Sequence, residues 1–164
     1  MSGKDHTGTE PVNARIFPIP PVVAGLFVAA GWALNRYLPL FERPAPVPFE
    51  ARIGGAAIMA CALAIAGLAF LGMRRARTTF HPGHKANALV YAGVFKRTRN
   101  PMYLSLTLAT LGLGIATANP WMIVAAPLLL LYLQERVVKR EEAYLSARFG
   151  AEYEGYKSKV RRWI

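Results

Sequence analysis

The sequence predicts an all-α membrane protein with about four transmembrane helices, and three observations support this fold class. Apolar residues make up 54% of the 164 residues, which is more than most soluble domains of this length contain. Four long apolar runs follow one another, and most charged residues lie between the second and third runs or after the fourth. We expect a single membrane domain over residues 1–164, with two N-terminal packing spans within 17–73 and a second half, 74–164, that holds the reactive side chains.

The second apolar run is the clearest span. It extends from Ile53 to Met73 without an ionisable side chain except the thiol of Cys61, and a spanning helix needs roughly 20 apolar residues. Ala56, Ala60 and Ala64 recur every four residues, which predicts a face for close packing against a neighbouring helix, and we expect Cys61 to be buried. In this reading the second span contributes packing rather than chemistry.

The first run extends from about Phe17 to Leu34 and follows several prolines. The fifteen residues at the start of the chain are polar, and no basic stretch leads into a short apolar core with a clear cleavage site. We therefore expect the first run to be a retained membrane anchor rather than a cleaved signal peptide.

The third and fourth runs predict a transmembrane hairpin. Met102 to Ala118 and Trp121 to Leu133 are separated only by Asn119-Pro120, a turn signal with no charge beside it. Pro101 fits the first turn of the third span, where a proline ring presets the backbone and no N–H is lost from the helix. Gly112 and Gly114 lie inside this span, where close helix packing explains them better than a phosphate-binding loop does.

The distribution of positive charge predicts the orientation in the membrane. Lys and Arg number seven in segment 74–100 and eight after Gln134, against three in segment 35–52 and none in the turn 118–121. Because positive charge is retained on the cytoplasmic side, both termini and segment 74–100 are expected inside, in a bacterial inner membrane. The net charge of +11 is then explained by this topology and by anionic lipid headgroups, and no nucleic-acid partner is expected.

An amphipathic helix is expected after the fourth span. Leu145, Phe149, Tyr153 and Tyr156 recur at three-to-four spacing among charged residues, with a possible break at Gly150. Such a helix would lie along the membrane interface with its aromatic rings at headgroup depth. Docking to the membrane surface and covering a site as a lid are both open interpretations.

Basic side chains at the edges of the spans offer one kind of candidate site. Arg99 and the free N–H groups of the helix that starts at Pro101 would together attract an anion. Arg136 and Arg140 are one helical turn apart, and such a pair would hold a phosphate or carboxylate, or else reach lipid phosphates at the membrane surface. All three are predicted as substrate-binding residues.

The adjacent carboxylates Glu141 and Glu142 offer a second candidate. Neighbouring helix positions point about 100° apart, so that one carboxylate can face a pocket while the other has a structural partner. A solvated acidic pair that answers nearby basic residues is the alternative. His81 and His84 are possible bases, but no metal-ligand spacing surrounds them, so we predict no metal.

Taken together, the ordered segments "ALVYAGVFKRTRNPMYLSL" and "REEAYLSARFGAEYEGYKSKVRRWI", separated by an apolar hairpin, resemble the membrane methyltransferases of the isoprenylcysteine carboxyl methyltransferase and phospholipid methyltransferase group. The resemblance covers about residues 80–164. It implies a helical bundle with a cytoplasm-facing pocket for S-adenosyl-L-methionine, and methyl transfer to a lipid-soluble or membrane-embedded acceptor. The lipid bilayer and a lipophilic substrate are the partners that it implies, and residues 74–164 become the cofactor-binding half.

The resemblance also implies which residues hold the cofactor. Matched one by one, the cofactor-binding residues are Asn87, Ala88, Leu89, Val90, Phe95, Asn100, Pro101, Met102, Tyr103, Glu141 and Glu142. Glu141 matches the acid that contacts the cofactor in the family, and Glu142 its companion. Because the donor is already an activated sulfonium compound, we assign no catalytic nucleophile.

Two departures from the group concern the acceptor. The prenylcysteine branch typically has His where Asn100 stands, and Val137 aligns with the substrate-binding arginine of that branch. These differences weaken the case for a prenylcysteine substrate, and a carboxylate, a thiol and an amine stay open as accepting groups. The alternative function is that of a non-catalytic basic membrane protein that binds anionic lipid or a partner protein. The sequence predicts no oligomeric state.

Overall fold

The computed structural model describes residues 19–40, 46–76 and 89–164, and these residues form helices and no strand. The elements are α1 (Pro20–Tyr37), α2 (Phe49–Arg75), the short 3₁₀ helix η1 (Gly93–Lys96), α3 (Pro101–Ala116), α4 (Pro120–Leu133), the π-helical turn η2 (Gln134–Val138), α5 (Lys139–Phe149) and α6 (Ala151–Lys159). The all-helical prediction is confirmed. Prolines stand at the first or second position of α1, α3 and α4, where they fix the helix starts.

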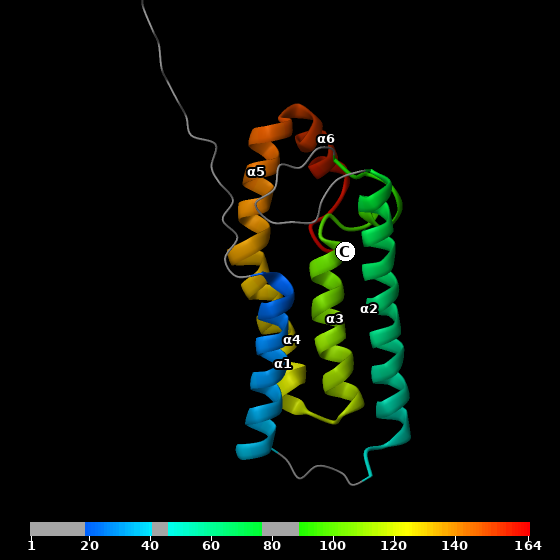
Figure 1. The fold of residues 1–164 in the computed structure, drawn as a ribbon, viewed down its shortest axis with the longest axis vertical. Helices are drawn as coiled ribbons and strands as arrows, with labels where there is room; N and C mark the ends of the chain where they lie inside the picture. The colour runs from blue at the N-terminus through cyan, green and yellow to red at the C-terminus, as the bar shows by residue number, and fades with distance from the viewer. Residues whose placement is uncertain (1–18, 41–45, 77–88) are drawn as a thin grey trace, which may run out of the picture.

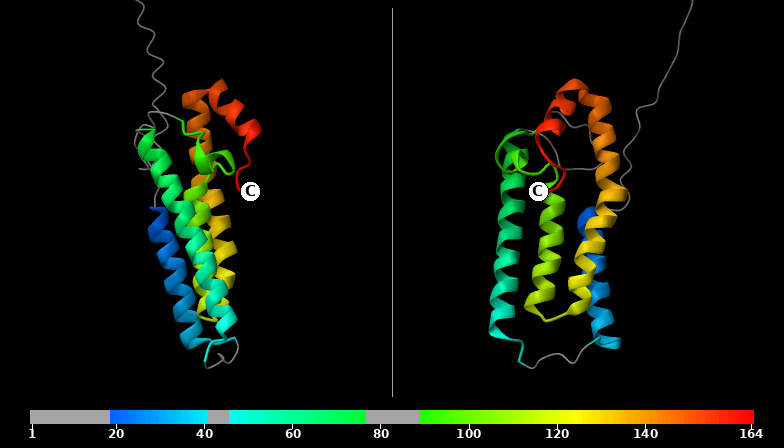
Figure 2. Two further views of the ribbon diagram at one scale, coloured as in Figure 1. Left: turned by 90° about the vertical axis from the view of Figure 1, so that its right-hand side faces the viewer. Right: turned by 180° about the vertical axis from the view of Figure 1, so that it is seen from behind.

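The four long helices run alternately up and down and form one bundle (Figures 1 and 2). The main contacts join α2 to α3, α3 to α4, and α4 to α1. The turn between α3 and α4, the end of α1 and the start of α2 lie at one end, called here the turn end. The other end carries residues 89–100, α5, α6 and residues 160–164, called here the cap. The residues expected to do chemistry therefore gather at one end of the bundle.

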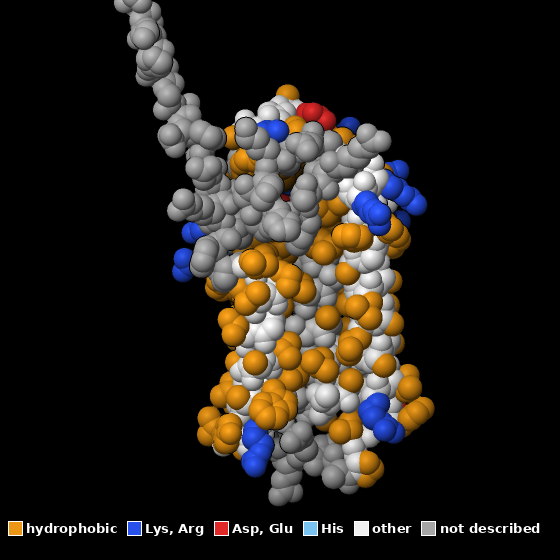
Figure 3. Space-filling model, viewed as in Figure 1, with side chains coloured by type: hydrophobic (Ala, Val, Ile, Leu, Met, Phe, Trp, Pro, Cys, Tyr) orange, Lys and Arg blue, Asp and Glu red, His pale blue; other side chains and the backbone are white. Residues whose placement is uncertain are grey.

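The outer surface of the bundle is apolar along the helices. Two helices are long and apolar enough to cross a membrane, Phe49–Arg75 and the continuous helix Pro120–Phe149, and Pro101–Ala116 is a shorter apolar helix. Large apolar side chains such as Leu26, Leu63 and Leu128 are more than half exposed, and Figure 3 shows many side chains of this kind over one face. Such a surface suits lipid rather than water. Whether all four long helices cross the bilayer stays a prediction.

Small residues bring α2 and α3 close together, but they are not the expected ones. The buried positions of α2 are Gly55, Ala62 and Ala69, seven residues apart, whereas Ala56, Ala60 and Ala64 are exposed. The prediction of a packing face at every fourth residue was wrong, because the crossing of α2 over α3 follows a seven-residue repeat. The expected burial of Cys61 was wrong for the same reason: Cys61 is exposed on the outer side of α2.

The glycines of α3 have the packing role that the sequence predicted. A Cβ atom on Gly112 would come within 2.8 Å of the Gly55 carbonyl oxygen on α2, and one on Gly114 within 2.9 Å of the Ile123 backbone nitrogen on α4. Helix α3 therefore packs between its neighbours backbone to backbone, which only residues without a side chain allow.

The turn end is held by one buried amide. Asn119 is 2% exposed; its side-chain oxygen accepts a hydrogen bond from the Met122 backbone N–H at 3.1 Å, and its Nδ2 donates to the Gly31 carbonyl at 3.2 Å. The first contact caps α4 and the second joins the hairpin turn to α1. Trp121 Nε1 donates to the Leu38 carbonyl at 2.8 Å, so that the end of α1 is joined to α4 twice.

The segment after the fourth span differs from the expectation. Helix α4 does not end at Leu133 but continues through η2 into α5 without a break, and α5 extends beyond the start of α3 (Figure 1). The chain then reverses at Gly150, whose φ of 51° favours glycine, and α6 folds back over the bundle end. The predicted break at Gly150 is confirmed, and the two short helices on either side of it form part of the cap. Docking of these helices on a membrane surface stays a prediction.

The positive charges of the described residues are unequally divided between the two ends. Arg36 and Arg52, in the last turn of α1 and the first turns of α2, lie at the turn end. The others lie at the cap or at the helix ends beside it: Arg74, Arg75, Lys96, Arg97, Arg99, Arg136, Lys139, Arg140, Arg148, Lys157, Lys159, Arg161 and Arg162. This distribution agrees with the predicted orientation, in which the cap lies on the cytoplasmic side.

Candidate functional site

The start of α3 meets α5 through one hydrogen bond. Tyr103 lies in the first turn of α3 and is 3% exposed; its hydroxyl donates to Glu141 Oε2 at 2.8 Å. The Tyr103 ring belongs to the apolar core together with Leu129, Leu133 and Val138. The core therefore fixes the ring, and the ring fixes one oxygen of Glu141 at the boundary between the apolar bundle and the polar cap.

Glu142, the next residue, is the centre of a buried ionic cluster. It is 8% exposed, and Arg162 donates to both of its oxygens, from Nε at 3.0 Å and from Nη2 at 2.7 Å. Arg99 Nη2 lies 3.3 Å from Glu142 Oε1. One carboxylate thus faces two guanidinium groups. Glu141 and Glu142 have different partners, Tyr103 for the first and two arginines for the second.

The tail, residues 160–164, crosses the start of α3. The Arg162 carbonyl accepts hydrogen bonds from Thr98 Oγ1 at 3.1 Å and from Asn100 Nδ2 at 3.0 Å, and the Arg99 backbone N–H donates to the Arg161 carbonyl at 3.1 Å. Trp163 Nε1 donates to Gln134 Oε1 at 2.9 Å. The tail therefore joins residues 98–100 to η2 and α5, and Asn100 has a structural partner in this structure.

Residues 89–97 lie between the end of α2 and α6. A Cβ atom on Gly72 of α2 would come within 3.5 Å of the Phe95 ring and 3.8 Å of the Val90 side chain, so both side chains pack at this point. The Tyr156 hydroxyl donates to the Phe95 carbonyl at 2.8 Å, and the Tyr91 hydroxyl donates to Glu152 Oε1. Two of the predicted cofactor residues, Val90 and Phe95, thus lie on the opposite side of the cap from Glu141's helix, at α2.

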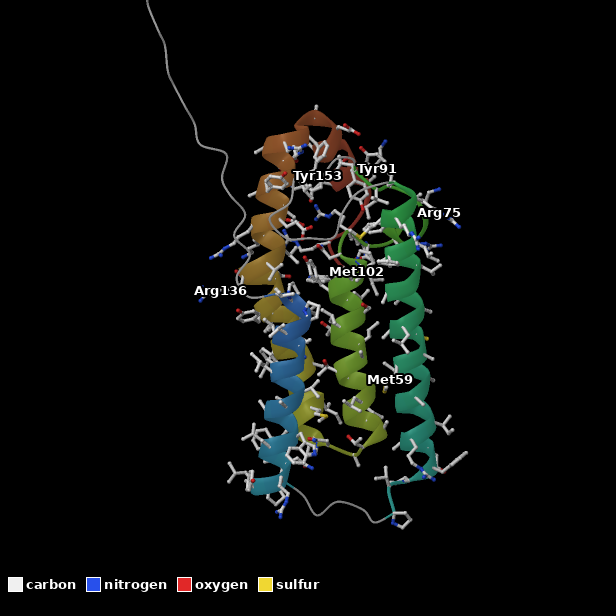
Figure 4. The ribbon with its side chains drawn as sticks, in the orientation of Figure 1. Met59, Arg75, Tyr91, Met102, Arg136 and Tyr153 are labelled. Carbon is white, nitrogen blue, oxygen red and sulfur yellow. The ribbon has the colours of Figure 1, made fainter. Side chains whose placement is uncertain are left out.

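Two tyrosines of α6 face the protein rather than solvent. Tyr153 is 2% exposed. Burial, together with the negative charge of Glu142, raises the pKa of Tyr153 from its ordinary 10.0 to about 12. Burial likewise raises the pKa of Tyr156. Figure 4 shows Tyr91 and Tyr153 beyond the start of α3, which Met102 marks. Tyr153 therefore places helix α6 against the ionic cluster, and a role of α6 as a lid stays a prediction.

Polar atoms without a partner remain in the cap. In the part of the chain that the structure describes, Arg99 Nε, Arg99 Nη1 and the Tyr144 hydroxyl are buried with no hydrogen-bond partner. Tyr144 follows Glu141 by three residues in α5, so the two side chains share one helix face. Buried polar groups are normally paired. Unpaired donors beside carboxylates fit a cofactor that carries both a carboxylate and positive charge, as S-adenosylmethionine does.

The remaining predicted residues lie apart from this cluster or outside the residues that the structure describes. Arg136 and Arg140 are exposed on η2 and α5, and Figure 4 shows Arg136 at about the level of Met102, on the outer side of its helix. Val137, which aligns with a substrate-binding arginine in the prenylcysteine branch, is 1% exposed in the core. Asn87, Ala88, His81 and His84 lie outside the described residues.

A family model for phospholipid methyltransferases matches residues 51–152. The match covers more than half of the chain and includes α2, η1, α3, α4 and α5. The chain belongs to the phospholipid methyltransferase family. Membership indicates a methyltransferase that acts on lipid or membrane substrates, and it agrees with the resemblance found in the sequence.

One protein similar to this chain comes from Haemophilus influenzae and is described as an uncharacterized protein. It is 40% identical over 63 residues, which are 38% of this chain and the whole of that protein. No solved structure matches the chain.

Several residues of the cluster were not identified as site residues from the sequence. Tyr153 and Arg162 reach the other residues of the cluster only through tertiary contacts, and Thr98 joins the tail through its hydrogen bond to the Arg162 carbonyl. The signal for Arg162 was present in the terminal "VRRW" of the resemblance, but its partner Glu142 is 20 residues earlier, on the other side of the reversal at Gly150. Spacing within one helix could not predict that pair.

Proposed function

We propose that this family member transfers a methyl group from S-adenosylmethionine to a lipid-soluble or membrane-embedded acceptor. The observation that best supports the proposal is the hydrogen bond between Tyr103 and Glu141. It joins the two sequence segments of the resemblance, which are separated by the whole hairpin. It also lies where the apolar bundle meets the cap, the place that a membrane acceptor and a water-soluble cofactor can both reach.

In the proposal, S-adenosylmethionine supplies a methyl group that its sulfonium sulfur already activates. The chain then has to hold donor and acceptor in line and to exclude water, and orientation of this kind contributes several kcal/mol to catalysis. Two arginines compensate the charge of Glu142, so Glu141 is the carboxylate that would contact the positive part of the cofactor, and the aromatic faces of Phe95 and Tyr103 suit a positively charged sulfur. Leu89, Val90, Asn100, Pro101 and Met102 would form the rest of the cofactor wall.

The acceptor stays open among a carboxylate, a thiol and an amine. A carboxylate needs no base, whereas an amine or a thiol must lose a proton during the transfer. Arg136 in η2 and Arg140 near the start of α5 are exposed, and Figure 4 shows Arg136 at about the level of Met102. Both would attract the anionic part of a lipid acceptor.

Cofactor binding tests the proposal directly. Isothermal titration of detergent-purified protein with S-adenosylhomocysteine should give a defined dissociation constant. Replacing Glu141→Gln should weaken binding about 10- to 100-fold, because a hydrogen bond to a charged group is worth about 1.5–3 kcal/mol. Glu135→Gln is the matched control, since Glu135 is an exposed carboxylate on the same continuous helix and its replacement should leave binding unchanged.

Failure to bind S-adenosylhomocysteine by correctly folded wild-type protein would contradict the proposal. Attachment to anionic vesicles that falls with added salt and does not respond to Glu141→Gln would instead indicate the non-catalytic basic module. If binding occurs, transfer of a labelled methyl group into a lipid extract, followed by mass analysis of the labelled product, identifies the accepting group.

A further inference from the structure

We propose that Arg99 binds the carboxylate of the methionine part of S-adenosylmethionine and thereby fixes the cofactor's amino-acid end beneath α6. This inference rests on the proposed function and adds to it the residue that binds the carboxylate of the cofactor. Neither the family match nor the list of cofactor residues implied by the resemblance assigns that role to Arg99. Three features of the cap support the assignment: its charge balance, the unpaired atoms of Arg99, and the neighbours of that side chain.

The charge balance around Glu142 favours Arg162 over Arg99. Arg162 takes both oxygens of Glu142 at 2.7 and 3.0 Å, whereas Arg99 reaches only one of them, at 3.3 Å. Arg99 is therefore the less completely paired of the two guanidinium groups, and incomplete pairing of a buried charge is unfavourable. The carboxylate group of a ligand would complete the pairing of Arg99.

The unpaired atoms show where that ligand would bind. The Arg99 side chain is only 9% exposed, and its Nε and Nη1 are buried without a hydrogen-bond partner. Leaving such donors unsatisfied costs free energy, and for charged groups the cost is largest. The planar fork of a guanidinium matches the two oxygens of a carboxylate. Helix α3 begins two residues later, and the positive end of its dipole adds to the attraction for an anion.

The neighbours of Arg99 favour an amino-acid carboxylate over a lipid phosphate. Arg99 is covered by the tail, through the bond from its backbone N–H to the Arg161 carbonyl, and Tyr153 of α6 lies close to its side chain. It therefore faces the inside of the cap, whereas Arg136 and Arg140 are exposed. Glu141 stands beside Glu142 and suits an ammonium group. A cation receptor next to an anion receptor is the pattern that an α-amino acid requires.

The test compares two ligands that differ only in the carboxylate. S-Adenosylhomocysteine and its decarboxylated analogue, the 3-aminopropyl thioether of 5′-thioadenosine, are titrated into wild-type protein and into Arg99→Gln. Wild-type protein should prefer S-adenosylhomocysteine about 10- to 100-fold, as expected for hydrogen bonds between charged groups. Arg99→Gln should lose that preference: its affinity for S-adenosylhomocysteine falls about 10- to 100-fold, while its affinity for the analogue stays within about threefold.

Two further variants keep the outcome interpretable. Arg97→Gln removes an exposed arginine two residues away and should leave both affinities unchanged. Arg99→Lys keeps the charge without the fork and should retain part of the preference. Unfolding in detergent micelles checks each variant; Arg99→Gln leaves the bidentate Arg162–Glu142 pair intact, so the fold should persist.

Three outcomes overturn the inference and leave the proposed function standing. In Arg99→Gln, the affinities for both ligands could fall equally, or neither affinity could fall. In the third outcome both affinities stay unchanged but methyl transfer needs a higher concentration of the lipid acceptor, which would assign Arg99 to an anionic group of the lipid. If neither ligand binds wild-type protein, the proposed function itself fails.

Discussion

The two ends of the helical bundle are closed in different ways. At the turn end, one neutral side chain, Asn119, joins α1 to the start of α4 with two hydrogen bonds. At the cap, the start of α3, α5 and the tail are joined through charged side chains instead: Glu141, Glu142, Arg99 and Arg162. The turn end is therefore joined by neutral hydrogen bonds of Asn119 and Trp121, without a charged side chain in those bonds.

The difference suggests that the ionic cluster serves more than folding. Removing two ions from water costs more than a neutral hydrogen bond does, and buried ion pairs are weak evidence for stability. Among the described residues, the buried unpaired atom at the turn end is the neutral Asn35 Oδ1, whereas the cap retains unpaired donors on the charged side chain of Arg99 and on Tyr144. Incomplete pairing in a buried charged cluster is the condition that a bound ligand would correct.

The largest effect on stability is expected from Glu142→Ala. The substitution leaves two buried guanidinium groups without their shared carboxylate and should destabilise the protein by about 3–5 kcal/mol. Denaturant unfolding in mixed micelles measures the change, and proteolysis should reach the tail more readily. Glu135→Ala is the control: its salt bridge to Lys139 is exposed, and the unfolding midpoint should not move. Wild-type stability in Glu142→Ala would show that the cluster is not a structural link.

A smaller effect is expected from Asn119→Ala. The substitution removes the cap of α4 and the side-chain hydrogen bond to the Gly31 carbonyl of α1, at a cost of about 1–2 kcal/mol. The affinity for S-adenosylhomocysteine should stay unchanged, because the turn lies at the far end of the bundle. Thr117→Ala, an exposed change in the same turn, should affect neither quantity. Reduced cofactor affinity in Asn119→Ala would contradict the separation of the two ends.

The smallest effect concerns alkaline pH and involves the cap only. Tyr153 has its pKa raised from 10.0 to about 12, chiefly by burial. Above pH 10 the unfolded chain loses this proton while the folded chain keeps it, so stability falls as the pH rises from about 10 to 12. The unfolding temperature should therefore fall less steeply over this range in Tyr153→Phe than in wild-type protein. Identical slopes in the two proteins would show that Tyr153 is not protected from ionisation.

The sequence predicted the helices well because their signals are local. Apolar length and the prolines at the helix starts placed α2, α3 and α4 to within a few residues, and Asn119-Pro120 predicted the hairpin turn. The packing face of α2 was wrong because small residues occur on several faces of that helix, and only the partner decides which face is used. Sequence spacing alone does not contain that information.

The candidate site was predicted less completely. Resemblance named Tyr103 and Glu141 as members of one site, and the structure brings them together at 2.8 Å. The partners of Glu142 and Asn100 could not be predicted, because both lie on the tail beyond the reversal at Gly150. The continuity of α4 and α5 was also missed, since a π-helical turn has no residue signature comparable to a proline or a glycine.

The π-helical turn Gln134–Val138 determines which side chains of the following helix α5 point toward α3. A π turn accommodates one more residue than an α-helical turn, and one residue corresponds to about 100° around a helix axis. The one extra residue in the π turn therefore rotates α5, with Glu141, by about 100° around the helix axis relative to the apolar face of α4. Deleting one residue there would straighten the hydrogen-bonding ladder and swing Glu141 away from Tyr103, while the apolar span before it kept its orientation in the lipid. Because of this π turn, the rotational orientation of the apolar helix α4 and that of the Glu141 face of α5 can differ within one continuous helix.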